Sequence, residues 1–125
     1  MERIAIAHKA LKSLECILNE PMTIIVRDAT IQRFEYTSEA VWKAVCDWLL
    51  KHESIEERHP RGCYRALFRI GKIDEDLALN LLQLVEDRNR TTHAYIETVA
   101  ISVFERIPQH AKSLRSVLES INYQN

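Results

Sequence analysis

Turn-forming residues are scarce in this sequence, which has 2 glycines and 3 prolines among 125 residues. So few cannot supply the many tight turns of an all-β fold, and helices are therefore favoured. No apolar run approaches the ~20 residues of a membrane-spanning helix. The first residues, MERIAIAHKALKSLE, carry too many charges for a secretory signal peptide. We therefore expect a protein without a membrane segment that is located in the cytoplasm.

Cysteine is also sparse, and the spacing of the cysteines does not indicate a disulfide framework or a zinc site. The 3 cysteines, Cys16, Cys46 and Cys63, are odd in number, far apart and include no C-x-x-C pair. This argues for a reducing compartment and against a disulfide framework or a zinc site. We predict that the cysteines are small apolar fillers.

The sequence contains none of the common catalytic or metal-binding motifs. The 5 histidines form no H-E-x-x-H pair, there is no G-x-S-x-G elbow, and 2 glycines cannot build a phosphate-binding loop. A hydrolase with a nucleophilic triad and a metalloenzyme are therefore excluded as interpretations. We expect no metal site and no cofactor.

What the sequence does contain is the composition of one ordinary globular domain. Hydrophobic residues make up 46% and charged residues 28%, and the formal net charge is -1. A charge so close to zero does not indicate nucleic-acid binding, so any such role must come from a local patch. Without a linker or repeat, residues 1–125 are expected to form a single domain.

Apolar residues recur at helical spacing in most of the chain. One stripe runs from Ile4 to Leu18 before Pro21, and a longer one covers a helix from about Arg27 to His52. Three further helices are predicted: a short one from Pro60 capped by Gly71, one that begins after Asp74, and one from Ile96 to Ile121 that is kinked or divided at Pro108. We predict an all-α, antiparallel up-and-down four-helix bundle with one additional short helix.

A basic ridge is predicted on the short helix. Arg61, Arg65 and Arg69 are spaced four apart, so each step turns only ~40° around the helix. Like charges at this spacing destabilise a helix slightly and require a counter-charge. Phosphate and acidic side chains of a neighbouring helix satisfy this requirement equally well. Glu35 and Glu39, also four apart, are interpreted as part of a salt-bridged surface.

The stretch DRNRTTHAY, from Asp87 to Tyr95, gathers polar side chains that suit neither a core nor a turn. On an unbroken helix Arg88 and His93 would lie ~140° apart, so one helix cannot direct both toward one phosphate. Convergence requires the helix to end near Thr91 and Thr92, or a second copy of the chain to supply one partner. The other interpretation is a polar helix end without a function.

Three blocks, in this order and at this spacing, carry a family resemblance. They are RDATIQRFEYTSEAVWKAV (27–45), HPRGCYRALFRIGKI (59–73) and EDRNRTTHAY (86–95). Over nearly its whole length the chain resembles the nucleotidyltransferase substrate-binding proteins of the HEPN superfamily, whose best-understood members are the HepT toxins.

The resemblance implies a HEPN-like helical bundle that forms a homodimer or a higher homo-oligomer. It also implies a metal-independent endoribonuclease with the motif R-x4-H-x-Y, in which Arg88 and His93 are catalytic and RNA is the substrate. Tyr95 would accept adenylyl groups from a minimal nucleotidyltransferase, an antitoxin encoded nearby. We assign phosphate or RNA binding to Arg61, Arg65, Arg69, Asn89 and Arg90.

Two alternatives stay open at this point. In the first alternative, the chain is a non-catalytic nucleotide- or substrate-binding subunit of a two-component nucleotidyltransferase. In the second, it is a helical bundle that serves only an interaction. The complete R-x4-H-x-Y motif favours the toxin, because a binding subunit has no need of a titrating histidine beside the arginine.

Overall fold

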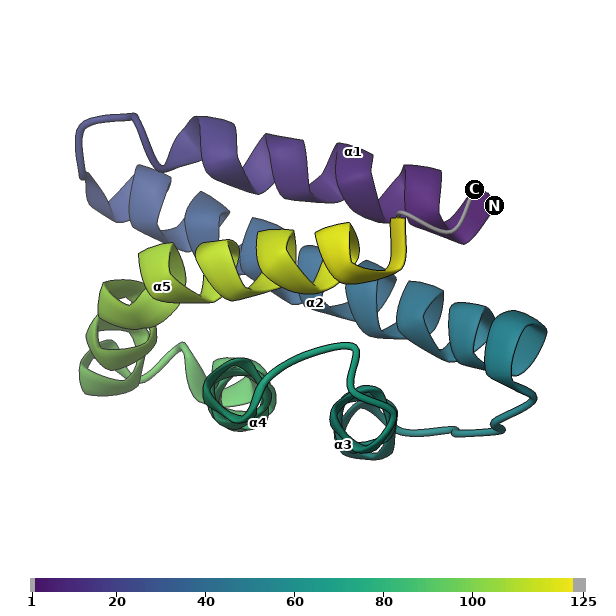
Figure 1. Ribbon diagram of the computed structural model, residues 1–125. Coiled ribbons are helices and arrows are strands. Elements are labelled where there is room, and N and C mark those ends of the chain that lie inside the picture. Colours follow the sequence, from purple (N-terminus) through teal and green to yellow (C-terminus); the bar gives the residue numbers. More distant parts are fainter. Residues whose placement is uncertain (1, 123–125) are drawn as a thin grey trace.

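The described part of the chain, residues 2–122 of a computed structural model, is all helical (Figure 1). In order, the elements are α1 (Glu2–Ile17), α2 (Ile24–Glu53), α3 (Pro60–Arg69), α4 (Glu75–Arg90), the 3₁₀ turn η1 (Thr91–His93) and α5 (Glu97–Asn122). In the view of Figure 1, α1, α2 and the second half of α5 extend side by side, while α3 and α4 are seen end-on beneath them. The predicted bundle with one short additional helix is confirmed, with α3 and α4 crossing the direction of the others.

The helix ends follow local sequence signals. The Thr23 side chain accepts a hydrogen bond from the backbone of Val26 and begins α2, and Asp74 does the same for Leu77 at the start of α4. Gly71, at φ 80°, closes α3: its amide bonds the Phe68 carbonyl, and the next amide, of Lys72, bonds that of Leu67. This is the glycine-terminated helix end predicted from the sequence. The cap at Thr23 was not predicted, so α2 begins three residues before the expected Arg27.

Pro108 lies inside α5, which continues through it as one helix. In Figure 1 the green first turns of α5 run at an angle to its yellow last turns. A proline removes one backbone hydrogen bond and crowds the preceding turn, and this bends a helix. The prediction of a kinked helix is thus confirmed. The bend allows α5 to contact α4 and η1 as well as α1 and α2.

Helix α2 is the central element because it contacts each of the other four α-helices. Its inward face contributes Phe34, Val41, Val45, Trp48 and Leu49, all at most 1% exposed. Burying such side chains releases about 1.5–3 kcal/mol each. Helix α4 packs against both α2 and α5, so this shared core also fixes the position of α4.

Cys46 of α2 and Cys63 of α3 form a disulfide, with their Cα atoms 5.7 Å apart. The prediction that all three cysteines are unpaired apolar fillers was therefore wrong for this pair. An odd number of cysteines and wide spacing do not reveal that the chain turns back after α2 and packs α3 across it, which brings residues 17 apart in sequence together. Only Cys16, which is exposed, remains as a free thiol among the described residues.

The disulfide also removes the cysteine-based reason for expecting a reducing compartment. The expected cytoplasmic location stays a prediction. Along residues 2–122, no helix has the length and apolar character needed to cross a membrane.

Candidate functional site

The α4–η1 junction divides the DRNRTTHAY stretch into two parts. The hydroxyls of Thr91 and Thr92 donate to the carbonyls of Arg88 and Asn89, at 2.6 and 3.0 Å. Threonine side chains that bond back to the preceding turn compete with continuation of the helix. Helix α4 therefore ends at Arg90. A helix end near Thr91 and Thr92 was one of the two conditions that the sequence set for convergence, and it leaves His93 and Tyr95 beyond the regular helix.

Arg88, on the last turn of α4, faces α2. Its Nη1 lies 4.0 Å from Glu35 Oε2, and its Nη2 lies 3.7 Å from Glu39 Oε1. Thr91 strengthens this connection because its hydroxyl lies 2.7 Å from Glu35 Oε2. The side chain is 27% exposed, so the guanidinium is partly accessible. Two carboxylates thus hold the motif arginine, as the interpretation of Glu35 and Glu39 as salt-bridged residues predicted.

His93 and Tyr95 lie together on the surface. Their rings are 6.0 Å apart at a steep angle, and Tyr95 is 81% exposed. Tyr95 also borders a groove of about 380 Å³ between the first turns of α2 and the start of α5. The groove is rich in acids, since Asp28, Glu35 and Glu97 line it together with Arg27. Within one chain, no hydrogen bond or ring contact among the described residues joins His93 to Arg88.

The side chains of Asn89 and Arg90 point in different directions. Asn89 is exposed and lies beside Arg88 at the edge of a small cavity. Arg90 turns the other way and donates to Asp87 Oδ1 and Ser102 Oγ, at 3.4 and 3.3 Å. The structure therefore places Arg90 in a network that ties α4 to α5, away from the exposed His93.

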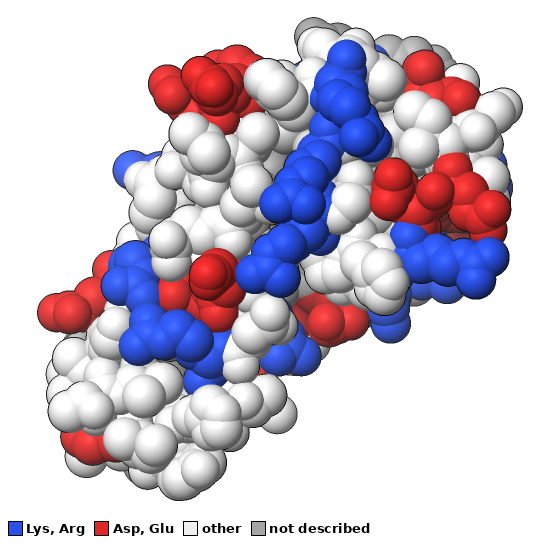
Figure 2. All heavy atoms as spheres, turned by 90° about the horizontal axis from the view of Figure 1, so that it is seen from below, with Lys and Arg blue, Asp and Glu red and all other residues white. Residues whose placement is uncertain are grey.

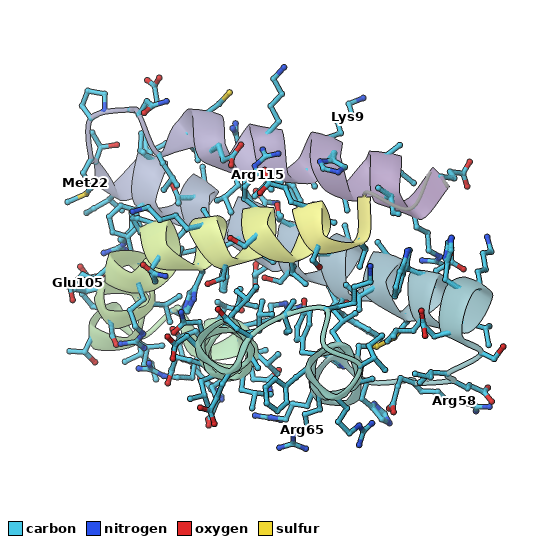
Figure 3. The ribbon with its side chains drawn as sticks, viewed as in Figure 1. Lys9, Met22, Arg58, Arg65, Glu105 and Arg115 are labelled. Carbon is cyan, nitrogen blue, oxygen red and sulfur yellow. A yellow bond between two sulfur atoms is a disulfide. The ribbon has the colours of Figure 1, made fainter. Side chains whose placement is uncertain are left out.

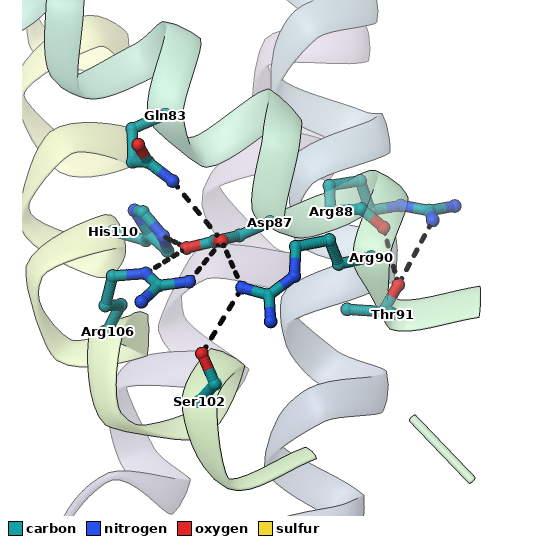
Figure 4. A network of polar contacts seen from close by, with 8 residues as sticks. All are labelled: Gln83, Asp87, Arg88, Arg90, Thr91, Ser102, Arg106 and His110. Atoms are coloured by element: carbon teal, nitrogen blue, oxygen red, sulfur yellow. Dashed lines mark hydrogen bonds and ion pairs between the residues drawn. The ribbon is translucent and has the colours of Figure 1, made fainter. Parts of the chain in front are cut away.

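Asp87 is the centre of that network, which Figure 4 shows from close by. Arg106 of α5 donates to both carboxylate oxygens at 2.6 Å, and His110 Nε2 lies 2.6 Å from Oδ2. Asp87 itself is fully buried. A buried carboxylate that is paired in this way anchors one segment to another, because breaking the pair leaves an uncompensated charge. The residue before the motif arginine thus fixes the end of α4 on α5.

The charges in this network determine the direction of two pKa shifts. Burial alone raises the pKa of Asp87, but the hydrogen bonds from Arg106 and His110 outweigh it and hold the pKa below its ordinary value. For His110, burial lowers the pKa more than the neighbouring carboxylate raises it. The Asp87 carboxylate is therefore charged at neutral pH and His110 is neutral, with its Nε2–H as the donor.

The basic ridge lies on the face that carries α3 and α4, where Figure 2 shows a stripe of Lys and Arg side chains. Arg65 and Arg69 are exposed, and Arg61 is half-buried. Arg69 pairs with Glu57 at 3.6 Å, but no acid among residues 2–122 forms an ion pair with Arg61 or Arg65. The acid for Arg69 comes from the connector before α3, and two ridge arginines keep their charge available to a ligand.

Sequence reasoning missed Asp87 and His110 as structural residues. A signal was present, because Asp87 continues the stripe of Leu77, Leu81 and Leu84, which faces the core. A carboxylate in such a position must find cationic partners. Arg106 and His110, four residues apart on α5, are spaced to meet it.

Comparisons with solved structures find the same overall fold. A protein of Thermus thermophilus is 39% identical, with a TM-score of 0.87 over 92% of this chain and 98% of that one. A mutant MntA–HepT toxin–antitoxin structure has a TM-score of 0.80 at 17% identity, covering 98% of this chain and 96% of that one. A tri-AMPylated Shewanella oneidensis HEPN toxin in complex with its MNT antitoxin has a TM-score of 0.78 at 17% identity, with the same coverage.

At so low an identity the two toxin structures show a shared fold. Among curated proteins, none matches the sequence. The model of one protein family, described as nucleotidyltransferase substrate binding protein like, matches residues 2–123. Sequence blocks, helix order and family model agree, and this chain belongs to the nucleotidyltransferase substrate-binding protein family with the helical fold of HEPN toxins.

Proposed function

We propose that this protein is the toxin of a toxin–antitoxin pair and cleaves RNA without a metal ion, with Arg88 and His93 as catalytic residues. The observation that carries the proposal is the complete R-x4-H-x-Y motif at the end of α4. There the helix break leaves His93 and Tyr95 exposed, while Arg88 stays anchored on α2. The neighbours solved as toxin–antitoxin complexes have the same fold.

The residue types suit cleavage of a phosphodiester bond. A neutral His93 takes the proton from a ribose 2′-hydroxyl, whose oxygen attacks the adjacent phosphorus. The 5′-oxygen then leaves with the proton that His93, now an imidazolium, returns to it. Arg88 holds the phosphate oxygens as negative charge accumulates in the transition state.

Two copies of the chain supply the full set of groups in this proposal. Within one chain Arg88 faces Glu35 and Glu39, while His93 lies on the surface beside Tyr95. A two-fold axis near the α4–η1 junction would bring the histidine of each protomer toward the arginine of its partner. We therefore propose a homodimer with a shared cleft. The ridge arginines Arg61 and Arg65 would bind the RNA backbone on the adjoining face.

The proposed antitoxin is a minimal nucleotidyltransferase that transfers adenylyl groups to the Tyr95 hydroxyl. In this reaction the phenol oxygen forms a bond to the α-phosphorus of ATP, and pyrophosphate leaves. Tyr95 is accessible at 81% exposure, and its ring contacts His93. A nucleotide attached there adds bulk and negative phosphate next to the catalytic pair, and so competes with RNA.

The experiment combines growth and mass measurement. Expression of the protein without its partner is expected to arrest growth, and His93→Ala is expected to relieve the arrest. His59→Ala is the matched control, because His59 is exposed and lies outside the motif. With the partner transferase and ATP, the mass should rise by about 329 Da per adenylyl group, and Tyr95→Phe should abolish the rise. Equal toxicity of His93→Ala would contradict the nuclease mechanism.

One observation favours a second function, that of a non-catalytic binding subunit of a two-component nucleotidyltransferase. The guanidinium of Arg88 is already paired with two carboxylates, so an incoming phosphate has to displace them. If the purified protein binds nucleotide or RNA, cleaves neither and shows no toxicity, this second function replaces the first.

A further inference from the structure

Exposed apolar side chains are concentrated at one end of the molecule. Half of the twelve large hydrophobic residues that are exposed in the described part of the chain lie in two short segments, 22–25 and 95–101. The start of α2 and the start of α5, which hold these segments, lie at the same end of the molecule (Figure 1). We call this set the apolar end, and it consists of Met22, Ile24, Ile25, Tyr95, Ile96 and Ile101, with exposed fractions between 44% and 82%.

An ion pair joins the two segments into one continuous surface. Arg27 of α2 donates a hydrogen bond to Glu97 Oε2 of α5 at 3.0 Å. Ile24 lies three residues before Arg27, which places it beside that arginine on the surface of α2. In the same way, Ile101 lies four residues after Glu97 on α5. Tyr95 borders the groove that Arg27 and Glu97 line, so the apolar end reaches the proposed adenylyl acceptor.

The outer charge of this surface is negative. The groove is lined by three acids, Asp28, Glu35 and Glu97, and by one cation, Arg27. Arg27 contacts both Asp28 and Glu97, at 3.2 and 3.0 Å. The Arg27 side chain is only 9% exposed, whereas those of Asp28 and Glu97 are 62% and 63% exposed. The two carboxylates therefore cover the cation and face outward, where a partner of positive charge complements them.

We propose that the apolar end and the acidic groove form the docking surface for the transferase that modifies Tyr95. The transferase binds this surface with apolar side chains that are flanked by lysines and arginines. The inference rests on the proposed adenylylation of Tyr95. An enzyme that transfers a group to the Tyr95 hydroxyl has to close around this side chain, so its contact surface includes the neighbouring residues. The isoleucines give the contact an apolar centre, and the carboxylates select a basic partner.

RNA and a second copy of the chain fit this surface less well than a basic protein. RNA is a polyanion, and the exposed carboxylates of Asp28 and Glu97 repel its phosphates. A second copy would present the same surface across a two-fold axis, so the carboxylates of the two grooves would approach each other. The homodimer proposed above instead meets at the α4–η1 junction. The charge therefore favours the transferase as the occupant.

The first test measures binding of the full-length protein to the nucleotidyltransferase encoded nearby, by isothermal titration calorimetry without ATP. Ile25→Ser is expected to raise the Kd roughly tenfold, because the contact loses an apolar side chain that is 82% exposed in the free protein. The matched control is Ile6→Ser. Ile6 is 55% exposed on α1, outside the apolar end, and its replacement should leave the Kd unchanged. Equal Kd values for the wild type and Ile25→Ser would overturn the proposal.

The second test reverses one charge. Asp28→Lys should slow association with the transferase several-fold at low salt and weaken the dependence of the rate on salt, because repulsion replaces an attraction. Glu119→Lys makes the same change at an exposed position near the other end of α5 and should leave the rate unchanged. Surface plasmon resonance measures both rates. Unchanged or faster association of Asp28→Lys would show that the partner does not bring positive charge to this surface.

Mass measurement separates failure of the docking surface from failure of the proposed function. If the transferase modifies the wild type at Tyr95 but binds Ile25→Ser equally well, the docking surface alone is refuted. If the wild type is neither bound nor modified, the proposed antitoxin is refuted together with the docking surface. If Ile25→Ser weakens only self-association in sedimentation, or only RNA binding in fluorescence anisotropy, the surface serves a second copy or RNA, and the proposal is wrong.

Discussion

Asp87 has the most constrained environment of any acidic residue in the described chain. It is fully buried and accepts hydrogen bonds from α4 and α5 at once. Because the next residue is Arg88, any movement of Asp87 also moves the proposed catalytic arginine. The stability of the fold and the geometry of the site therefore both depend on these two consecutive residues.

Replacing the carboxylate tests this directly. Asp87→Asn keeps the size of the side chain but removes the charge that Arg106 and His110 contact. We expect the free energy of unfolding to fall by about 3 kcal/mol, below the upper end for buried pairs because Arg106 is 39% exposed. Urea denaturation measures the change. Glu86→Gln, at an exposed neighbouring position, should change the free energy of unfolding by less than about 0.5 kcal/mol. Equal changes in the two variants would show that Asp87 does not anchor α4 on α5.

His110 makes the stability of the fold depend on pH. Burial lowers its pKa in the folded chain, so below pH ~6.5 the unfolded chain takes up a proton that the folded chain excludes. Its contribution is complete above this pH and is lost as the pH falls toward the lowered folded pKa. The depressed pKa of Asp87 adds a second loss below pH ~4.

Urea midpoints measured between pH 7.5 and pH 5 should therefore decrease with acidification. His110→Gln should flatten the decrease, because the titrating ring is gone while a hydrogen-bond donor remains. His59→Gln, at an exposed position, should leave it unchanged. A wild-type midpoint that is constant down to pH 5 would contradict the lowered pKa of His110.

Among the elements, α3 has the most specialised attachment. It is short, presents the basic ridge outward and buries Cys63, Tyr64, Ala66 and Leu67 inward. The disulfide fixes this helix to α2 within one turn of Trp42, which lines the cavity behind Arg88. The position of the ridge and the shape of the cavity thus depend on the same covalent bond.

Reduction of this bond should destabilise the fold. Closing a loop of this length restricts the unfolded chain by about 3 kcal/mol. We expect dithiothreitol to lower the urea midpoint of the wild type to nearly that of Cys46→Ser, and to have no effect on Cys46→Ser itself. Cys16→Ser should respond like the wild type, because Cys16 is a free, exposed thiol. An equal midpoint with and without reductant would show that the bond does not form in solution.

At the scale of the whole molecule, charge is separated although the net value is only -1. Acids line the groove beside Tyr95, while cations form the stripe over α3 and α4 (Figure 2). Figure 3 shows Arg65 and Lys9 on opposite sides of the molecule. A near-neutral chain can therefore attract a polyanion along one face and repel it elsewhere.

This separation predicts how RNA binding depends on salt. Each phosphate neutralised on a single strand contributes about 0.7 to the slope of log affinity against log salt concentration. Arg65→Ala should reduce the slope by about this amount, and Lys9→Ala, on the opposite side, should leave it unchanged. Fluorescence anisotropy with a labelled RNA measures both. Equal slopes for the two variants would place the RNA on another face.

The sequence was sufficient to predict the helices, apart from the exact start of α2, because helix boundaries have local causes. Asp74 and Gly71 mark their helix ends with side-chain or backbone chemistry that acts over a few residues. The family resemblance identified the motif that the α4–η1 junction displays. In contrast, the Cys46–Cys63 bond depends on how α3 folds back against α2, which no local signal encodes.

Partners of the site residues also came only from the three-dimensional arrangement. Glu35 and Glu39 were expected to form salt bridges, but not with Arg88, which lies far away in sequence and on another helix. Arg90 was expected to bind phosphate, and its contact with Asp87 depends on the bend that brings α5 beside α4. Long-range pairings of this kind require the packed fold.

The boundary between α4 and η1 divides the R-x4-H-x-Y motif into a part on a regular helix and a less constrained part beyond it. Arg88 belongs to a regular helix anchored at Asp87, whereas His93 and Tyr95 belong to a single short turn and its flank. Amide hydrogens should exchange slowly up to the end of α4 and rapidly just beyond it. A modifying enzyme could therefore draw the tyrosine outward by opening one turn, at little energetic cost to the domain that carries it.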